Sequence, residues 1–164
     1  MRIDIAAEAD RVLKEELVLT FIGEERVRPW VVLKARLLDL GGDEKWKTRY
    51  ITSLGAPRPL TGDTGWTSDG GQPLRSLIDR SLKRGIDVML RDAVGALPRG
   101  KGRVVKLRGN WVWVKPTMEV SGEILEETAE HLIVKPDVAD AIVFAGISIV
   151  EPGALTISAF DTAQ

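Results

Sequence analysis

The chain has 164 residues, a formal net charge of −1 and 44% hydrophobic residues, which suits one ordinary globular domain or two small ones with a buried core. The near-neutral charge argues against a chain built wholly around polyanions, and the absence of cysteine excludes disulfides, thiol catalysis and thiolate metal sites. No basic segment followed by an apolar one opens the chain, and no run approaches 18 apolar residues, so the sequence predicts neither a signal peptide nor a transmembrane segment.

The first predicted elements are strands. Residues 9–22 fit both a helix and a strand, and the second half, Leu-Val-Leu-Thr-Phe-Ile at 17–22, favours a strand. A turn at residues 23–26 follows, and Pro29 stands near the start of the next strand, where a missing N–H is tolerated.

Residues 31–52 are predicted to form a hairpin that turns at residues 40–43. In the first strand every second residue is apolar, as a half-buried strand requires. The residues expected on the covered face are Val31, Leu33, Ala35, Leu37, Trp46 and Tyr50. With the preceding strand, the hairpin gives a meander of three strands.

A loop rich in Gly, Pro, Ser, Thr and Asp spans residues 53–73, with Trp66 in its middle. Loops of this length inside a compact domain are usually functional or mobile. Trp66 therefore has two interpretations: it packs into the core and holds the loop, or it is a stacking residue at a binding site.

A long helix is predicted after this loop, with Ser68 or Asp69 as its cap and Pro73 in its first turn. Apolar residues recur at spacings of three and four from Leu74 to Ala93, and a polar face that includes Asp92 lies opposite. Two small residues within the apolar stripe, Ser81 and Gly85, permit close approach to the sheet. Gly95 and Pro98 end the helix.

Residues 96–102 form the predicted hinge between two modules. Short strands follow at residues 104–107, 111–114, 118–125, 131–135, 142–144, 147–150 and 155–158. So many short strands imply a small barrel or sandwich. The expected fold class is therefore α+β: an antiparallel β-meander covered by one long helix (residues 1–97), followed by a small all-β barrel-like domain (residues 98–164).

The run VSGEILEETAEHLIVK followed by IVFAGISIV resembles the Sm-like and SH3-like small barrels, in which a bent strand carrying Gly-x-Ile, here Gly122-Glu123-Ile124, precedes a reversal and further short strands. The resemblance covers residues 118–152. The turn at residues 126–130 lacks the aromatic residue found near RNA in bacterial Sm-like chaperones.

Residues 9–94 are similar to a domain of bacterial cell-envelope lipoproteins, with Gly42, Trp46 and Tyr50 at the spacing G-x-x-x-W-x-x-x-Y, then a Trp-containing loop and a long helix. This resemblance implies a periplasmic or outer-membrane-anchored protein, provided that an upstream leader with a lipidated cysteine was removed. Otherwise the chain is expected in the cytoplasm.

No catalytic motif is found. Residues 95–102 nearly spell a P-loop, but the final Ser or Thr is missing and a helix precedes the segment where a strand is needed. His131 is a lone histidine without cysteine ligands, and the acids around residues 119–130 are expected on a solvated face. The sequence therefore predicts neither an enzyme nor a cofactor or metal site.

The strongest functional hint is a basic segment beside two tryptophans, Trp111 and Trp113, which strand alternation would place on one face. Such a surface suits a nucleic-acid backbone and stacked bases, or anionic lipid headgroups; alternatively, the tryptophans fill an interface between the modules. With Trp66, the candidate binding surface comprises Arg99, Lys101, Arg103, Lys106, Arg108, Trp111 and Trp113.

These observations predict a non-enzymatic structural or assembly protein of the bacterial cell envelope that acts through contacts with another protein or with a second copy. The alternative is a nucleic-acid-binding module that uses the basic segment and the barrel.

Overall fold

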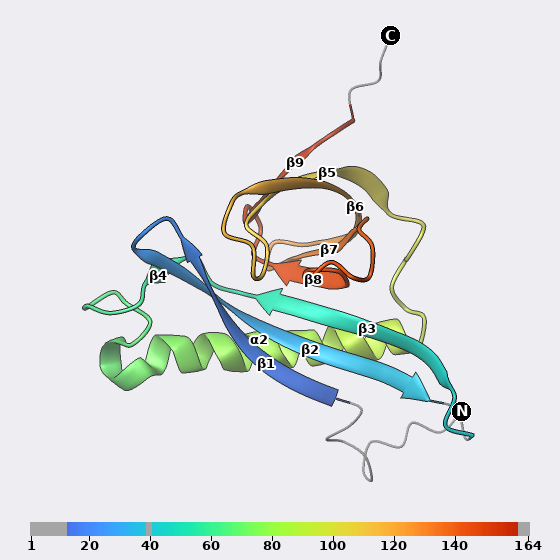
Figure 1. Ribbon diagram of the computed structural model, residues 1–164, viewed down its shortest axis with the longest axis horizontal. Coiled ribbons are helices and arrows are strands. Elements are labelled where there is room, and N and C mark those ends of the chain that lie inside the picture. The colour runs from blue at the N-terminus through green and yellow to red at the C-terminus, as the bar shows by residue number, and fades with distance from the viewer. Residues whose placement is uncertain (1–12, 39–40, 161–164) are drawn as a thin grey trace.

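A computed structural model describes residues 13–38 and 41–160 (Figure 1). Within these residues the chain forms nine strands and one helix: β1 (Leu13–Ile22), β2 (Arg26–Leu38), β3 (Glu44–Ser53), β4 (Arg58–Pro59), α2 (Ser68–Ala93), β5 (Arg103–Gly109), β6 (Met118–Glu127), β7 (Leu132–Pro136), β8 (Ile147–Val150) and β9 (Leu155–Ser158). The predicted first strand, hairpin and long helix are confirmed. The start of the segment at residues 9–22, and Leu40 of the hairpin turn, lie outside the described residues.

The strands that the structure describes form a single mixed sheet, in the order β1-β2-β3-β8-β7-β6-β5-β9, with β4 beside β2. Most neighbours are antiparallel, but β3 and β8 run parallel, from Tyr50 opposite Ile147 to Ser53 opposite Val150. The prediction of a meander followed by a separate barrel-like domain is therefore wrong, because this parallel pairing joins both sets of strands into one open sheet. The expected boundary between residues 97 and 98 stays a prediction.

Two predicted C-terminal strands are not formed. Residues 111–114 make a turn, in which Trp113 has a left-handed backbone with a φ of 60°. Residues 142–144 belong to a loop held by Arg49, whose guanidinium donates to the carbonyl oxygens of Ile142 and Val143 at 3.0 and 2.9 Å. In these two segments Trp111, Val112 and Phe144 are buried in the core. Trp113, Ile142 and Val143 are exposed.

Helix α2 packs on one face of the sheet, against β2 and β3 (Figure 1). The core on this side contains Leu33 and Tyr50, with Trp46 half-buried and its ring 6.1 Å from that of Tyr50. A Cβ at Gly85 would lie 2.9 Å from Leu33 Cδ1 and 3.1 Å from Thr52 Oγ1. The small residue is therefore what permits the helix to approach the sheet this closely.

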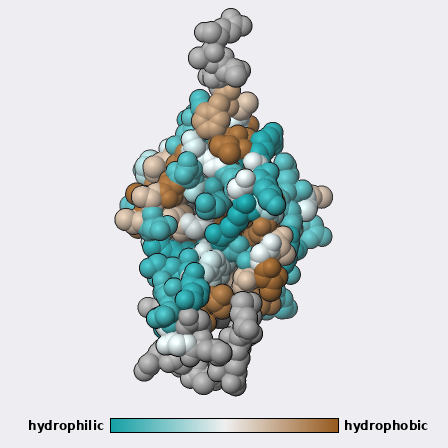
Figure 2. All heavy atoms as spheres, turned by 90° about the vertical axis from the view of Figure 1, so that its right-hand side faces the viewer, coloured by the Kyte–Doolittle hydropathy of each residue, from teal (hydrophilic) through white to brown (hydrophobic). Residues whose placement is uncertain are grey.

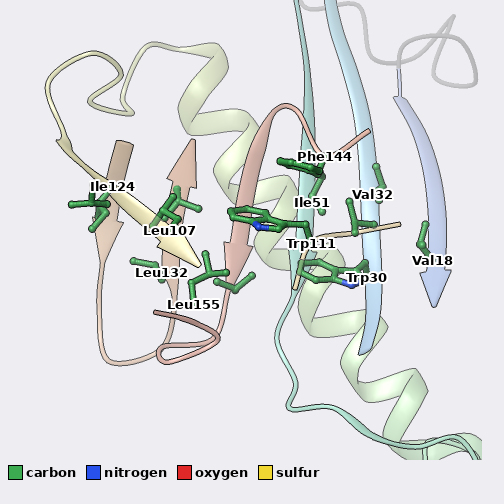
Figure 3. Close-up of a cluster of buried hydrophobic side chains, with 14 residues drawn as sticks. Val18, Trp30, Val32, Ile51, Leu107, Trp111, Ile124, Leu132, Phe144 and Leu155 are labelled. Carbon is green, nitrogen blue, oxygen red and sulfur yellow. The ribbon is translucent and has the colours of Figure 1, made fainter. Parts of the chain in front are cut away.

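On the other face, the C-terminal strands curl over β1, β2 and β3 (Figure 1). A second core fills the space between them, and Figure 3 shows Trp111 between side chains from the two sets of strands. Its ring stacks on Phe144 at a centroid distance of 5.1 Å. The early and late strands thus share one core as well as one sheet.

Candidate functional site

The predicted surface residue Trp66 lies in the core. Its side chain is 2% exposed, and its indole Nε1 donates a 2.7 Å hydrogen bond to the carbonyl oxygen of Val27. The guanidinium of Arg58 lies over the ring at 5.1 Å. The indole therefore ties the long loop to β2, and it presents no free face for stacking.

The two tryptophans after β5 do not share a face. Trp111 is 1% exposed and donates to the carbonyl oxygen of Met118 at 3.3 Å, whereas Trp113 is 38% exposed. The turn at residues 111–114 replaces the alternation of a strand and separates the two rings.

The basic residues of the predicted surface are dispersed. Lys101, Arg103 and Arg108 are exposed, and Lys106 is half-buried, with its Nζ 5.9 Å from the ring centroid of Phe160. Arg103 faces the side of β5 opposite to Lys106 and Arg108, because side chains alternate along a strand.

Arg99 belongs to a buried network instead. Its Nε donates a 2.6 Å hydrogen bond to Asp92 Oδ1, and a second bond joins its Nη2 to Oδ2. Tyr50 Oη donates to the same carboxylate at 2.5 Å. The sequence places Asp92 on the polar face of the helix, but its side chain is 3% exposed and ties α2 to β3.

The P-loop-like segment already holds an internal anion. The backbone amides of Gly100 and Gly102 donate to the carboxylate of Glu123, the former at 2.9 Å. Desolvation alone would raise the pKa of Glu123, but the hydrogen bonds from Gly100, Gly102 and Lys101 outweigh it and lower the pKa below its ordinary value. These amides are therefore engaged by the chain itself and do not form an open phosphate cradle.

A third charged group joins the end of α2 to the hairpin of β6 and β7. Arg91 forms two hydrogen bonds with Glu126, and His131 Nε2 lies 2.7 Å from Glu126 Oε1. The bond from Arg91, with that from His131, lowers the pKa of Glu126 to about 2 against the opposing effect of burial. This network is structural, and His131 is buried within it.

One exposed apolar surface of the described residues is the edge of the sheet at β1. Every second residue from 17 to 21 lies on one face of this strand. These residues are Leu17, Leu19 and Phe21, and they are 47%, 39% and 45% exposed. Their cross-strand partners include Val31 and Val27, which are buried under α2 and the loop. The helix packs mainly on β2 and β3, and within the described residues it leaves the same face of β1 partly exposed.

The outer edge of β1 also carries open backbone groups, because among the described residues β1 pairs only with β2. Val18 and Thr20, on the opposite face, are buried. The candidate functional site is therefore an apolar edge, defined here as the exposed row Leu17, Leu19 and Phe21 together with the free edge of β1.

No family model matches the chain, and neither the curated proteins nor the solved structures include a significant match. Within residues 13–38 and 41–160, no helix is long and apolar enough to cross a membrane. In the same residues, no cluster of three or more His, Cys, Asp or Glu side chains is placed to hold a metal ion.

Proposed function

We propose that this chain is a non-enzymatic structural or assembly protein that acts through protein contacts made at the apolar edge. The single observation that carries the proposal is the exposed row Leu17, Leu19 and Phe21 on a strand that pairs, among the described residues, with β2 alone. Edge strands of soluble proteins are usually protected by charge, proline or a covering segment. From residue 17 to residue 22 β1 has no charged residue and no proline.

The occupant that fits this edge is the β1 strand of a second copy. In an antiparallel pair centred on Leu19, Leu19 faces its own counterpart and Leu17 faces Phe21. Centring the pair on residue 18 would instead place Glu15 opposite Phe21, so the centre at Leu19 best matches apolar residues with each other. Two-fold pairing of this kind is the commonest symmetry of homo-oligomers and is a form of β-strand addition.

The compartment is part of the proposal. The resemblance of residues 9–94 to a lipoprotein-type domain supports a role in the bacterial cell envelope, in the periplasm or anchored to the outer membrane. An upstream open reading frame that encodes a leader ending in a cysteine would support this location. A stop codon immediately upstream of Met1 would place the protein in the cytoplasm.

Sedimentation velocity tests the contact. The wild-type chain is expected to form a concentration-dependent dimer, and Leu19→Lys is expected to remain a monomer because it places like charges opposite each other at the centre of the pair. Val104→Lys is the matched control, since Val104 is an exposed apolar residue (59%) on β5, where it is paired with Glu123 of β6. A wild-type monomer at high concentration, or equal loss of dimer in both variants, would contradict the proposal.

Nucleic-acid binding is the second candidate function, and the exposure of Lys101, Arg103, Arg108 and Trp113 favours it. Single-stranded nucleic acid would then bind with a steep dependence on salt, and a Lys101→Glu, Arg103→Glu variant would bind more weakly. Absence of binding at low salt would exclude this candidate.

A further inference from the structure

A cleft of about 740 Å³ lies beside the ends of β2 and β3 that extend beyond the pairing with β8. The segment that follows β7, the start of β8 and Arg99 complete its wall. These ends of β2 and β3 lie at the right of Figure 1, on the side that faces the viewer in Figure 2, where hydrophilic residues occupy much of the surface. The volume suits a small molecule.

Four cations stand in two opposed pairs on the strands that line this cleft. In the antiparallel register Lys34 is directly opposite Arg49, and Arg36 is directly opposite Lys47. All four lie on one face, because alternate residues of a strand share a face. Like charges at directly opposed positions destabilise a sheet, so two such pairs side by side are costly without an anion.

The chain compensates this charge only in part. Lys34 pairs with Glu16 at 3.1 Å, and Arg49 is engaged by backbone carbonyls. Lys47 has a long contact of 3.6 Å with Glu44. The Nε of Arg36 is buried, and no described residue accepts a hydrogen bond from it.

Among the described residues that line the cleft, cationic side chains outnumber acidic ones. Among the described residues, three acidic ones line the cleft, namely Glu44, Asp137 and Asp140. Against them stand six cationic residues, namely Lys34, Arg36, Lys47, Arg49, Arg99 and Lys135. Two of these already have acidic partners outside the lining, since Lys34 pairs with Glu16 and Arg99 with Asp92. Because the full chain has a net charge of −1, this concentration of positive charge is local and does not reflect a generally basic protein.

We propose that the cleft binds a small molecule that carries a diphosphate group. Opposed side chains start about 5 Å apart, and residues two apart along a strand are about 7 Å apart, so the two cation pairs can each contact one of two linked phosphates. Arginine offers a planar fork of donors and lysine a mobile point charge, which together suit phosphate oxygens. This inference is independent of the apolar edge of β1.

Isothermal titration calorimetry with inorganic pyrophosphate at low ionic strength tests the site. The wild-type chain is expected to bind pyrophosphate more tightly than orthophosphate, because only pyrophosphate engages both pairs at once. Arg36→Gln and Lys47→Gln are each expected to weaken the binding by roughly tenfold or more, since a hydrogen bond to a charged group is lost.

Lys83→Gln is the matched control. Its side chain is 76% exposed and paired with Asp79, much as that of Lys47 is 71% exposed and paired with Glu44. The control is expected to bind as the wild type does, and circular dichroism establishes that the variants are folded. Three results would overturn the proposal: no binding of pyrophosphate by the wild type, equal binding by folded Arg36→Gln and Lys47→Gln, or displacement of pyrophosphate by single-stranded DNA that binds more tightly.

Discussion

Tyr50 on β3 donates a 2.5 Å hydrogen bond to the buried carboxylate of Asp92 near the end of α2. The two residues connect the helix to the middle of the sheet at a point where Arg99 supplies the balancing charge. Because Tyr50 lies 42 residues from Asp92 in the sequence, this contact is specific to the native packing.

Removal of the Tyr50 hydroxyl is expected to destabilise the fold. Tyr50→Phe should lower the free energy of unfolding in urea by about 1.5–3 kcal/mol, since a hydrogen bond to a charged buried group is lost. Asp79→Asn, on the exposed face of the same helix, should change it by no more than about 0.5 kcal/mol. Equal effects of the two substitutions would contradict the role of the Tyr50–Asp92 contact.

The ionisation of Tyr50 gives a second prediction. Burial and the bond to Asp92 raise its pKa far above the ordinary value, so the neutral form is favoured in the folded state. The resulting stability is present below the unfolded pKa of about 10 and is lost as the pH rises above it. Tyr50 is the only tyrosine of the chain, so tyrosinate absorbance reports on it alone. The tyrosinate absorbance should appear together with unfolding. Its appearance while the protein is still folded would contradict the burial of the Tyr50 hydroxyl.

The lowered pKa of Glu126 leads us to expect a loss of stability in acid. Its pKa is lowered from 4.5 to about 2 by Arg91 and His131. A lowered pKa contributes stability that is present above 4.5 and disappears as the pH falls toward 2. Urea unfolding across this window should show a steeper loss in the wild type than in Glu126→Gln. Glu130→Gln, which changes a 79% exposed side chain, should keep the wild-type slope.

Because Trp111 lies in the shared core, its truncation should lower the free energy of unfolding far more than truncation of Trp113. Trp111→Ala should lower the free energy of unfolding by about 3–5 kcal/mol, as large core truncations do. Trp113→Ala should cost less than about 1 kcal/mol, since that ring is 38% exposed. Fluorescence and circular dichroism should report one transition, because the early and late strands unfold together. Two separate transitions would contradict the shared core.

Local sequence patterns were sufficient to predict the elements in which apolar residues recur at a regular spacing. The alternation at Val31, Leu33 and Ala35, and the spacing of three and four from Leu74 onward, are properties of neighbouring residues, so they predict the hairpin and α2 directly. The pairing of β3 with β8 is different. Ile147–Val150 is buried on both faces, and such a short apolar run fits a parallel or an antiparallel neighbour equally well.

The candidate sites depended on distant contacts for the same reason. The sequence shows the apolar run at residues 17–22, but only the tertiary structure shows that β1 lies at an edge and that α2 leaves it uncovered. Likewise, the opposition of Lys34 to Arg49 follows from the hairpin register, whereas the cleft beside them needs the loop after β7. Trp113 was misplaced because a turn with a positive φ interrupts the alternation.

Cysteine cross-linking tests the central claim, the pairing of two β1 strands, most directly. The chain contains no cysteine, so a single introduced thiol can bond only to its counterpart in another copy. In the proposed register Leu19 faces itself at a separation that permits a disulfide. Leu19→Cys should therefore give a covalent dimer on mild oxidation, while Val104→Cys should remain largely monomeric. Failure of Leu19→Cys to cross-link, or equal yields from both variants, would contradict the account.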